Sequence, residues 1–282
     1  MNMLKDNIIG IDIGSSTTKI IEYKENEIVN KKITANKDII KEIDSFLYEN
    51  KIDIKDIYRF VLTGIGANRI DVSKYNVKTE IIKEFDAIGT GGLYLSGSEK
   101  AIVVSIGTGT AFVRADKLNL KHLGGTGVGA GTLTNLCKRF AGTKDFDEIL
   151  NLSKIGNLDN VDLKIGDITE EKINTLPSDL TLSNFGNLKP SASNSDIILG
   201  ILNMIFETIG MMAAFSSIND DIKEIVLIGN IVTLPCVKSI LKKIENLYDI
   251  SFIIPNEAQY AVALGAIIKS ATKGSGPFFP IL

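Results

Sequence analysis

Two hydroxyl-rich turns at matching places in the two halves of the sequence restrict the fold most strongly. The first is DIGSSTTK at residues 12–19, after the apolar run IIGI, and the second is SIGTGT at 105–110, after AIVV. At Gly14 and Gly107 a run typical of a buried strand ends, and another strand pattern follows almost at once. This weak internal repeat predicts that each half opens with an antiparallel hairpin whose turn carries hydroxyl groups.

The residue types of these turns are those of an anion-binding nest. Glycine permits close backbone approach, and hydroxyl and amide groups donate hydrogen bonds. In the first turn Asp12 adds an acid that could hold Mg²⁺ through water, and Lys19 adds a positive charge. Either turn alone is also compatible with an ordinary hairpin. Together, at equivalent points of two similar halves, they predict a phosphate clamp.

Composition excludes several classes of function. The 282 residues are 44% hydrophobic and 23% charged, enough for two modest domains or one large domain. Lys plus Arg number 31 against 34 Asp plus Glu, so the net charge of -3 gives no reason to expect nucleic acid or an anionic membrane as a partner. Cys137 and Cys236 lie far apart and only one His is present, which argues against a disulfide framework or a zinc site. We expect a cytoplasmic protein, since no signal-peptide pattern opens the sequence.

Strand and helix patterns alternate along the rest of the chain. Residues 37–50 and 131–140 have helical spacing, whereas 58–64 and 77–84 are strand candidates. From residue 224 onward strand, helix, strand and helix follow one another, which predicts parallel strands with helical crossovers. Residues 156–194 are rich in Asp, Asn, Gly, Ser and Pro and are predicted to form an insertion with loops. The closing KGSGPFFPIL is interpreted as a tail or a partner-contact strand.

One apolar stretch, residues 196–218, is nearly long enough to cross a bilayer and has Glu207 as its only internal charge. A carboxylate near the hydrocarbon centre would be unfavourable. We therefore interpret the stretch as a helix buried between domains or in a subunit interface, and expect a homodimer without membrane contact.

Three further motifs could carry chemistry. GGTGVGAGT at 124–132 precedes a helix pattern and could direct amides at a phosphate. It fits G-x-G-x-x-A, but the following KDFDEILNLSKIG is a poor strand candidate, which argues against a dinucleotide fold, and no GxxxxGK[ST] occurs. In EFDA at 84–87, Glu84 could act as a base, whereas Asp86 could simply cap a helix. VLIGN at 226–230 could end a strand beside a nucleotide ring.

The order of these motifs resembles the actin, sugar kinase and Hsp70 superfamily, and within it the type II pantothenate kinases. The features that carry the resemblance are EFDA, IGTGT, LGGTGVGAGT, LTLSNFGN, VLIGN and AVALGAI, spread over residues 8–272. The resemblance implies an α/β fold of two actin-like (ribonuclease H-like) lobes with mixed sheets flanked by helices. The lobes would span 1–97 and 98–282, with ATP in the cleft between them.

The resemblance also implies roles for individual residues. Glu84 would be the general base toward the primary hydroxyl of pantothenate, or of a related small alcohol, in the first step of coenzyme A biosynthesis. Asp12 would hold Mg²⁺ through water, and Thr108, Ala111 and His122 would face the acceptor. The expected nucleotide contacts are Asp12, Ile13, Gly14, Ser15, Ser16, Thr17, Thr18, Lys19, Thr108, Gly109, Ala130, Gly131, Thr132, Leu133, Thr134, Phe146 and Asn230.

Three positions depart from the family pattern. Ala111 stands where Ser or Thr is usual, His122 where Arg is usual, and Asn230 where Ser is commoner. A histidine with an ordinary pKa near about 6.5 is only partly charged at neutral pH, unlike arginine. Three alternatives follow: Lys121 substitutes as a point charge, pantothenate is bound weakly, or the acceptor is a related hydroxylated amide.

Two rival functions stay open at this point. The first turn also resembles that of activator ATPases of acyl-CoA dehydratases, which hold an iron–sulfur cluster with cysteines in glycine-rich sequence. Cys137 and Cys236 lie in NLCKRF and LPCVKS, which supply no such pair. The other rival is a non-catalytic nucleotide sensor that uses the clamp only for binding.

Overall fold

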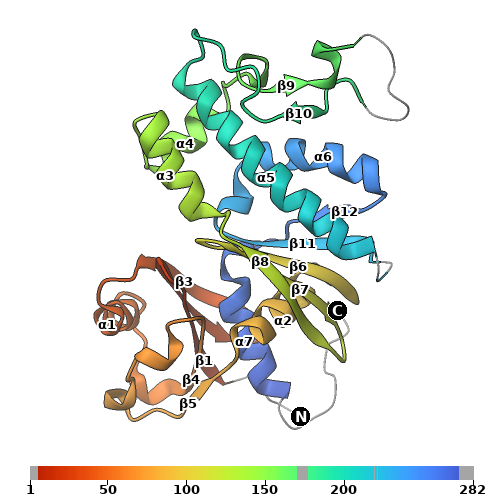
Figure 1. Cartoon of the computed structure of the whole chain (residues 1–282). Helices are drawn as coiled ribbons and strands as arrows, with labels where there is room; N and C mark the ends of the chain where they lie inside the picture. The colour runs from red at the N-terminus through yellow and green to blue at the C-terminus, as the bar shows by residue number, and fades with distance from the viewer. Residues whose placement is uncertain (1–5, 170–176, 219, 221, 273–282) are drawn as a thin grey trace.

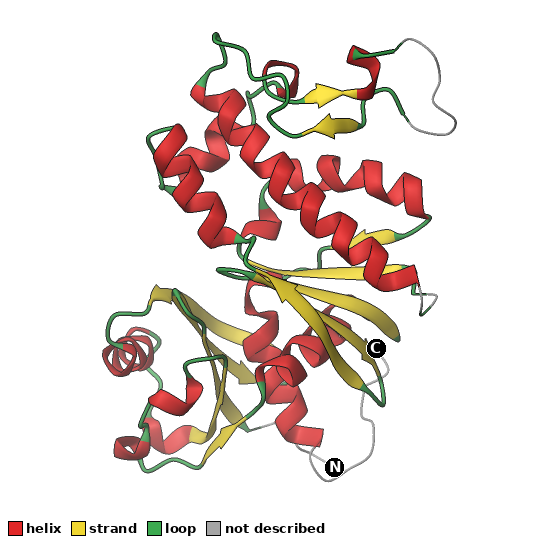
Figure 2. Cartoon of the chain, in the orientation of Figure 1, coloured by secondary structure: helices red, strands yellow, loops and turns green. Residues whose placement is uncertain are grey.

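The fold is built on two five-stranded mixed sheets with helices between them and outside them (Figures 1 and 2). The structure, a computed structural model, describes residues 6–169, 177–218, 220 and 222–272. The closing segment 273–282, interpreted above as a tail, lies outside the described residues. We call the first sheet with its outer helix the N-terminal lobe, and the second sheet with its outer helices the C-terminal lobe.

The N-terminal sheet has the strand order β3-β2-β1-β4-β5. Its strands are β1 (Asn7–Ile13), β2 (Thr17–Lys24), β3 (Glu27–Ala35), β4 (Ile57–Thr63) and β5 (Thr79–Ile81). β1 pairs antiparallel with β2 and parallel with β4, so the first predicted hairpin is confirmed. β5 is much shorter than the strand candidate at 77–84, because helix α2 begins at Glu84. Helix α1 (Ile39–Glu49) covers one face through Ile43 and Phe46, which pack with Ile9 and Ile11.

The C-terminal sheet repeats the same opening hairpin. Its order is β12-β11-β6-β7-β8, from strands β6 (Lys100–Ile106), β7 (Thr110–Asp116), β8 (Leu120–Thr126), β11 (Glu224–Gly229) and β12 (Ser251–Ile253). Thr110 of β7 pairs with Ile106 of β6 just as Thr18 of β2 pairs with Ile13 of β1. β11 runs parallel to both β6 and β12, which confirms the predicted crossover topology.

Helices α2 (Glu84–Ser96) and α7 (Ala261–Thr272) lie between the two sheets and pack on each other (Figure 1). They cross where both have glycine. A Cβ on Gly91 would lie 1.9 Å from the backbone oxygen of Ala261, and one on Gly265 would lie 2.0 Å from that of Ala87. The two helices therefore make backbone-to-backbone contact at the centre of the molecule.

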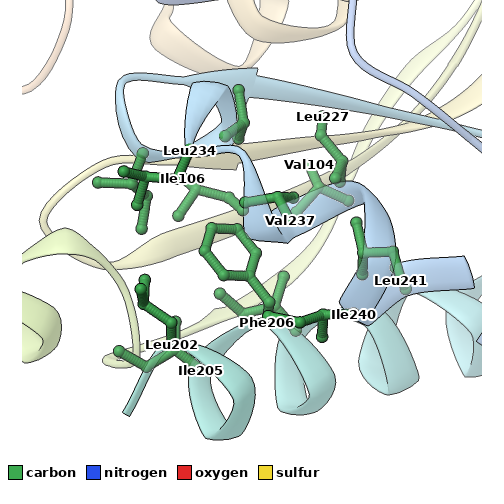
Figure 3. Packing of buried hydrophobic residues seen from close by; sticks show 14 of the residues in the cluster. Val104, Ile106, Leu202, Ile205, Phe206, Leu227, Leu234, Val237, Ile240 and Leu241 are labelled. Atoms are coloured by element: carbon green, nitrogen blue, oxygen red, sulfur yellow. The ribbon is translucent and has the colours of Figure 1, made fainter. Parts of the chain in front are cut away.

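The outer face of the C-terminal sheet is covered by α3 (Ala130–Phe140), α4 (Phe146–Ser153), α5 (Asn194–Ile218) and α6 (Cys236–Tyr248). Phe206 of α5 packs among side chains of β6, β11 and α6, including Val104, Leu227 and Val237 (Figure 3). α5 is, among the described residues, the helix long and apolar enough to cross a membrane, and 61% of its apolar window is buried inside the protein. Its hydropathy is accounted for by a position in the core.

Residues 156–169 and 177–194 form a small attachment at the far end of the C-terminal lobe (Figure 1). It contains a two-stranded sheet of β9 (Leu163–Lys164) and β10 (Thr181–Ser183), within the stretch predicted to be an insertion with loops. Asn184 donates a hydrogen bond to Glu207 of α5 at 2.9 Å, and Asn203 of α5 donates one to the buried Asp162 at 2.8 Å. Burial, first of all, raises the pKa of the Glu207 carboxyl. The single charge inside the apolar helix thus has a partner within the chain.

Short 3₁₀ turns complete the described structure. They are Ile54–Asp56, Ala67–Arg69, Ser73–Tyr75, Leu158–Asn160, Ile165–Asp167, Ile231–Thr233 and Ala258–Tyr260. The predicted lobe boundary at 97/98 falls between α2 and β6.

Candidate active site

The two hydroxyl-rich turns meet across the gap between the lobes. Ser15 Oγ donates a hydrogen bond to Thr108 Oγ1 at 2.7 Å, and the hydroxyls of Ser16 and Thr108 are 2.8 Å apart. Both turns line one cavity of about 490 Å³, together with Asp12, Lys19 and Glu84. The arrangement brings the two candidate phosphate loops and the candidate base to a single site.

Local hydrogen bonds hold the first turn in place. Gly14 N donates to Thr17 O at 3.1 Å, and Asn36 Nδ2 donates to Gly14 O at 2.5 Å. Asn36 also accepts from the hydroxyl of Thr18 at 2.5 Å. Thr18 is fully buried, so its hydroxyl serves the turn rather than the cavity.

The second turn is fixed by the start of α3. The backbone amides of Ala130 and Gly131 donate to Gly107 O and Thr108 O at 2.8 and 3.0 Å. A Cβ on Gly129 would approach both of these oxygens to 2.8 Å, so glycine is needed where the helix starts. The amides at this helix N-terminus therefore support the second turn.

An ion pair lies at the base of the first turn. Asp12 and Lys19 are register partners of β1 and β2, and Lys19 Nζ lies 3.1 Å from Asp12 Oδ2. Asp12 is only 4% exposed. Among the described residues no group of three or more His, Cys, Asp or Glu side chains could cage a metal. Asp12 nevertheless fits Mg²⁺, which proteins commonly bind through one carboxylate, water and substrate phosphates.

Glu84 is the first residue of α2 and lines the same cavity. Its pKa is raised above the ordinary glutamate value, first by burial and second by the negative charge of Asp12, against the opposing effect of Lys19. A carboxylate with a raised pKa is a better proton acceptor. Glu84 therefore has the position and the electrostatics of a general base.

Phe85 and His122 form a stacked pair at the edge of the cavity. Their ring centroids are 3.7 Å apart and the ring planes differ by 8°. His122 comes from β8 and Phe85 from α2, and both line the cavity. Ala111 of β7 also lines it. Thr108, Ala111 and His122, the three residues expected at the acceptor end, thus share one cavity with Glu84.

Several of the expected nucleotide contacts are not among the residues that line this cavity, and their contact with a nucleotide stays a prediction. Residues 130–134 are not among those that line the cavity, and neither are Ile13 and Thr18, which are buried in the N-terminal lobe. Phe146 begins α4 and packs against the C-terminal core. Asn230 directly follows Gly229, which does line the cavity, and its side-chain Oδ1 is buried without a hydrogen-bond partner. An unsatisfied acceptor of this kind could receive a ligand N–H.

Three cavity residues had no role assigned from the sequence: Ile65, Gln259 and Val262, although Val262 lies in the AVALGAI motif. Ile65 follows β4 between two glycines, a pattern that could have drawn attention to it. Val262 lies at the start of α7, which packs beside α2, and Gln259 lies in the 3₁₀ turn just before α7, so their place at the cavity involves contacts between distant parts of the chain.

The two lobes, each opening with a hairpin that supplies a turn to one cleft, define the actin-like class of ATPases and kinases. Solved structures support this class. The activator of 2-hydroxyisocaproyl-CoA dehydratase from Clostridium difficile, with bound ADPNP, matches 98% of this chain and 99% of its own at 16% identity and a TM-score of 0.69. A ROK family glucokinase from Streptomyces griseus, with glucose and AMPPNP, matches 92% and 97% at 12% identity and a TM-score of 0.60.

Within this class the chain belongs to the Fumble family, whose model matches residues 98–241. A type II pantothenate kinase from Bacillus thuringiensis is 28% identical over 96% of this chain and 100% of its own length. One from Oceanobacillus iheyensis is 28% identical over 93% and 99%. The family-level resemblance read from the sequence is confirmed.

Proposed function

We infer that this chain is an ATP-dependent kinase that phosphorylates the primary hydroxyl of pantothenate, the first step of coenzyme A biosynthesis. The proposal depends mainly on one observation: two phosphate-type turns and Glu84 converge on one cavity. The chain aligns over nearly its whole length with a protein named type II pantothenate kinase. ATP as phosphoryl donor agrees with the nucleotide analogues in structural neighbours.

In the reaction, Glu84 accepts the proton of the acceptor hydroxyl while that oxygen attacks the γ-phosphorus in line. The O–P bond forms, the bond to the β-phosphate oxygen breaks, and ADP leaves. Lys19 and the donors of both turns neutralise charge on the phosphoryl oxygens. Ser15, Ser16 and Thr108 would exchange their mutual hydrogen bonds for phosphate oxygens. Mg²⁺ held through water by Asp12 would supply further charge neutralisation.

The assay of purified protein is ADP release with pantothenate, pantetheine and related primary alcohols, with the product identified by mass spectrometry. We expect turnover that needs both Mg²⁺ and pantothenate. Nucleotide binding without acceptor-dependent ADP release would contradict the proposal and favour the sensor function.

The two cysteines give little support to the activator function. Cys137 is fully buried in the C-terminal core, and burial raises its pKa to about 12 and that of Cys236 to about 11. Thiolates are the form that binds a cluster, and burial disfavours them. A brown protein with iron–sulfur absorbance would support the activator function instead.

We further propose a cytoplasmic homodimer, without nucleic acid or membrane partners. The buried side of α5 packs against other parts of the same chain. A partner subunit would therefore cover the exposed end of α5, where Phe215 and Ile218 are 56% and 59% exposed. A monomer mass by light scattering at micromolar concentration would refute the dimer.

A further inference from the structure

Ile65 is an apolar side chain that is not buried in the hydrophobic core. It is 69% exposed, yet it lines the same cavity as Glu84. Single exposed apolar residues are ordinary on a protein surface. One that lines the same concave site as a candidate base is placed where a ligand would cover it.

The turn that carries Ile65 is fixed against the first phosphate loop. Gly66 N donates to Ile13 O at 3.0 Å, and Ala67 N donates to Gly64 O at 3.1 Å. Gly64 has a φ of +90°, and a Cβ there would lie 2.4 Å from Ile13 O. A Cβ on Gly66 would lie 2.4 Å from Ile13 Cγ2. Both neighbours of Ile65 therefore need glycine, and its backbone is held at a set place beside the loop.

The surroundings of Glu84 within the cavity include several hydrocarbon groups. Ile88 lies one helical turn after Glu84, on the same face of α2, and Phe85 and Val262 also line the cavity. Of these, Phe85 is 39% exposed, while Ile88 and Val262 are buried. Ile65 and Phe85 thus offer open apolar surface in the cavity that contains the candidate base.

We propose that Ile65 determines acceptor specificity by contacting the alkyl group next to the reacting hydroxyl, so that the preferred acceptor is a primary alcohol on a branched carbon. This inference rests on the proposed function and specifies which part of the acceptor is recognised. A branched alkyl group against Ile65 fills space that water would otherwise occupy. The same contact keeps water from attacking the γ-phosphorus in place of the acceptor.

The test compares two acceptors and three proteins. The acceptors are pantothenate and its analogue without the two methyl groups beside the hydroxymethyl carbon. The proteins are the wild type, Ile65→Ala and the matched control Ile155→Ala, whose isoleucine is 73% exposed and does not line the cavity. Wild type and control should prefer the branched acceptor in kcat/KM by about tenfold or more, the effect of a methyl group in an apolar pocket.

Ile65→Ala should remove most of this preference while KM for ATP stays within about twofold. Ile65→Val should keep most of it, and a thermal melt of each variant checks the fold. An unchanged preference in Ile65→Ala would overturn the inference.

The proposed function can fail separately. If the wild type releases no ADP with either acceptor, the proposed pantothenate kinase activity is wrong. The role of Ile65 is then tested by measuring ADP release in the absence of an acceptor. A rise of about threefold or more in Ile65→Ala, relative to wild type and Ile155→Ala, supports a water-excluding contact at the reacting phosphate. Equal rates in the three proteins overturn it.

Discussion

The imidazole of His122 lies parallel to the ring of Phe85, with ring centroids 3.7 Å apart. His122, Phe85 and Glu84 line the same cavity, so the stack fixes the single histidine of the chain within the site that holds the candidate base. Arginine also stacks on aromatic rings, and its charge does not depend on pH. The stack therefore offers a place where an arginine could be introduced with little rearrangement.

We predict that His122→Arg lowers KM for pantothenate about five- to tenfold at pH 7.5, because a guanidinium binds a carboxylate through two charged hydrogen bonds. A neutral amide analogue of pantothenate serves as the matched control, and its KM should change less than about twofold. Steady-state kinetics with both acceptors provide the measurement. Equal changes for the two acceptors would mean that position 122 does not face the carboxylate.

Glu84→Gln should reduce kcat by about 10²–10⁴-fold, the usual contribution of general acid–base catalysis. Affinity for a non-hydrolysable ATP analogue, measured by calorimetry, should stay within about twofold, since the substitution preserves shape. Asp86→Asn is the control, because Asp86 lies two residues further along α2 and does not line the cavity. A Glu84→Gln enzyme that retains the wild-type rate would remove Glu84 from the mechanism.

The pH dependence follows from the raised pKa of Glu84. A general base works only when deprotonated, so kcat/KM should fall as the pH drops through this pKa, at a higher pH than an ordinary glutamate would give. Asp12 contributes to the shift through its negative charge. Asp12→Asn should lower the overall rate and also move this acidic limb to lower pH. An unmoved limb in the pH–rate profile would show that the two carboxylates are not coupled.

Gly91→Ala should lower the free energy of unfolding by about 2–3 kcal/mol, because its Cβ would overlap the backbone oxygen of Ala261. Thermal unfolding measures the change. Gly127→Ala is the control, since a Cβ there meets nothing within 4 Å. Equal melting temperatures for the two variants would mean that the helices can move apart freely at the crossing.

Much of the fold could be predicted because its signals are local. The two hairpins follow from apolar runs that end in Gly14 and Gly107, and the parallel strands follow from the alternation after residue 224. The convergence of the two turns was predicted only because they occupy equivalent positions in two similar halves. The direct contact between Ser15 and Thr108 depends on how the lobes pack, which no local pattern determines.

Other features of the candidate site could not be predicted from the sequence, because they depend on contacts between segments that are distant in the chain. Ile65 enters the cavity because Gly64 and Gly66 fit against Ile13, a relationship created by the parallel pairing of β1 with β4. The place of Phe146 beside adenosine follows from the family resemblance alone and stays a prediction; in the structure Phe146 packs against the C-terminal core. A pattern of residue types indicates what a segment can do, but not which other segment it will meet.

The crossing of α2 and α7 has a consequence for how this enzyme can evolve. Glu84 is the first residue of α2 and Val262 lies at the start of α7, and both line the cavity. The spacing of the two helices therefore sets the width of the cavity at this place. The helices can approach this closely because Gly91 and Gly265 each carry a hydrogen atom where alanine would carry a methyl group. Larger acceptors would therefore be accommodated by remodelling the surrounding loops, while these two glycines stay unchanged.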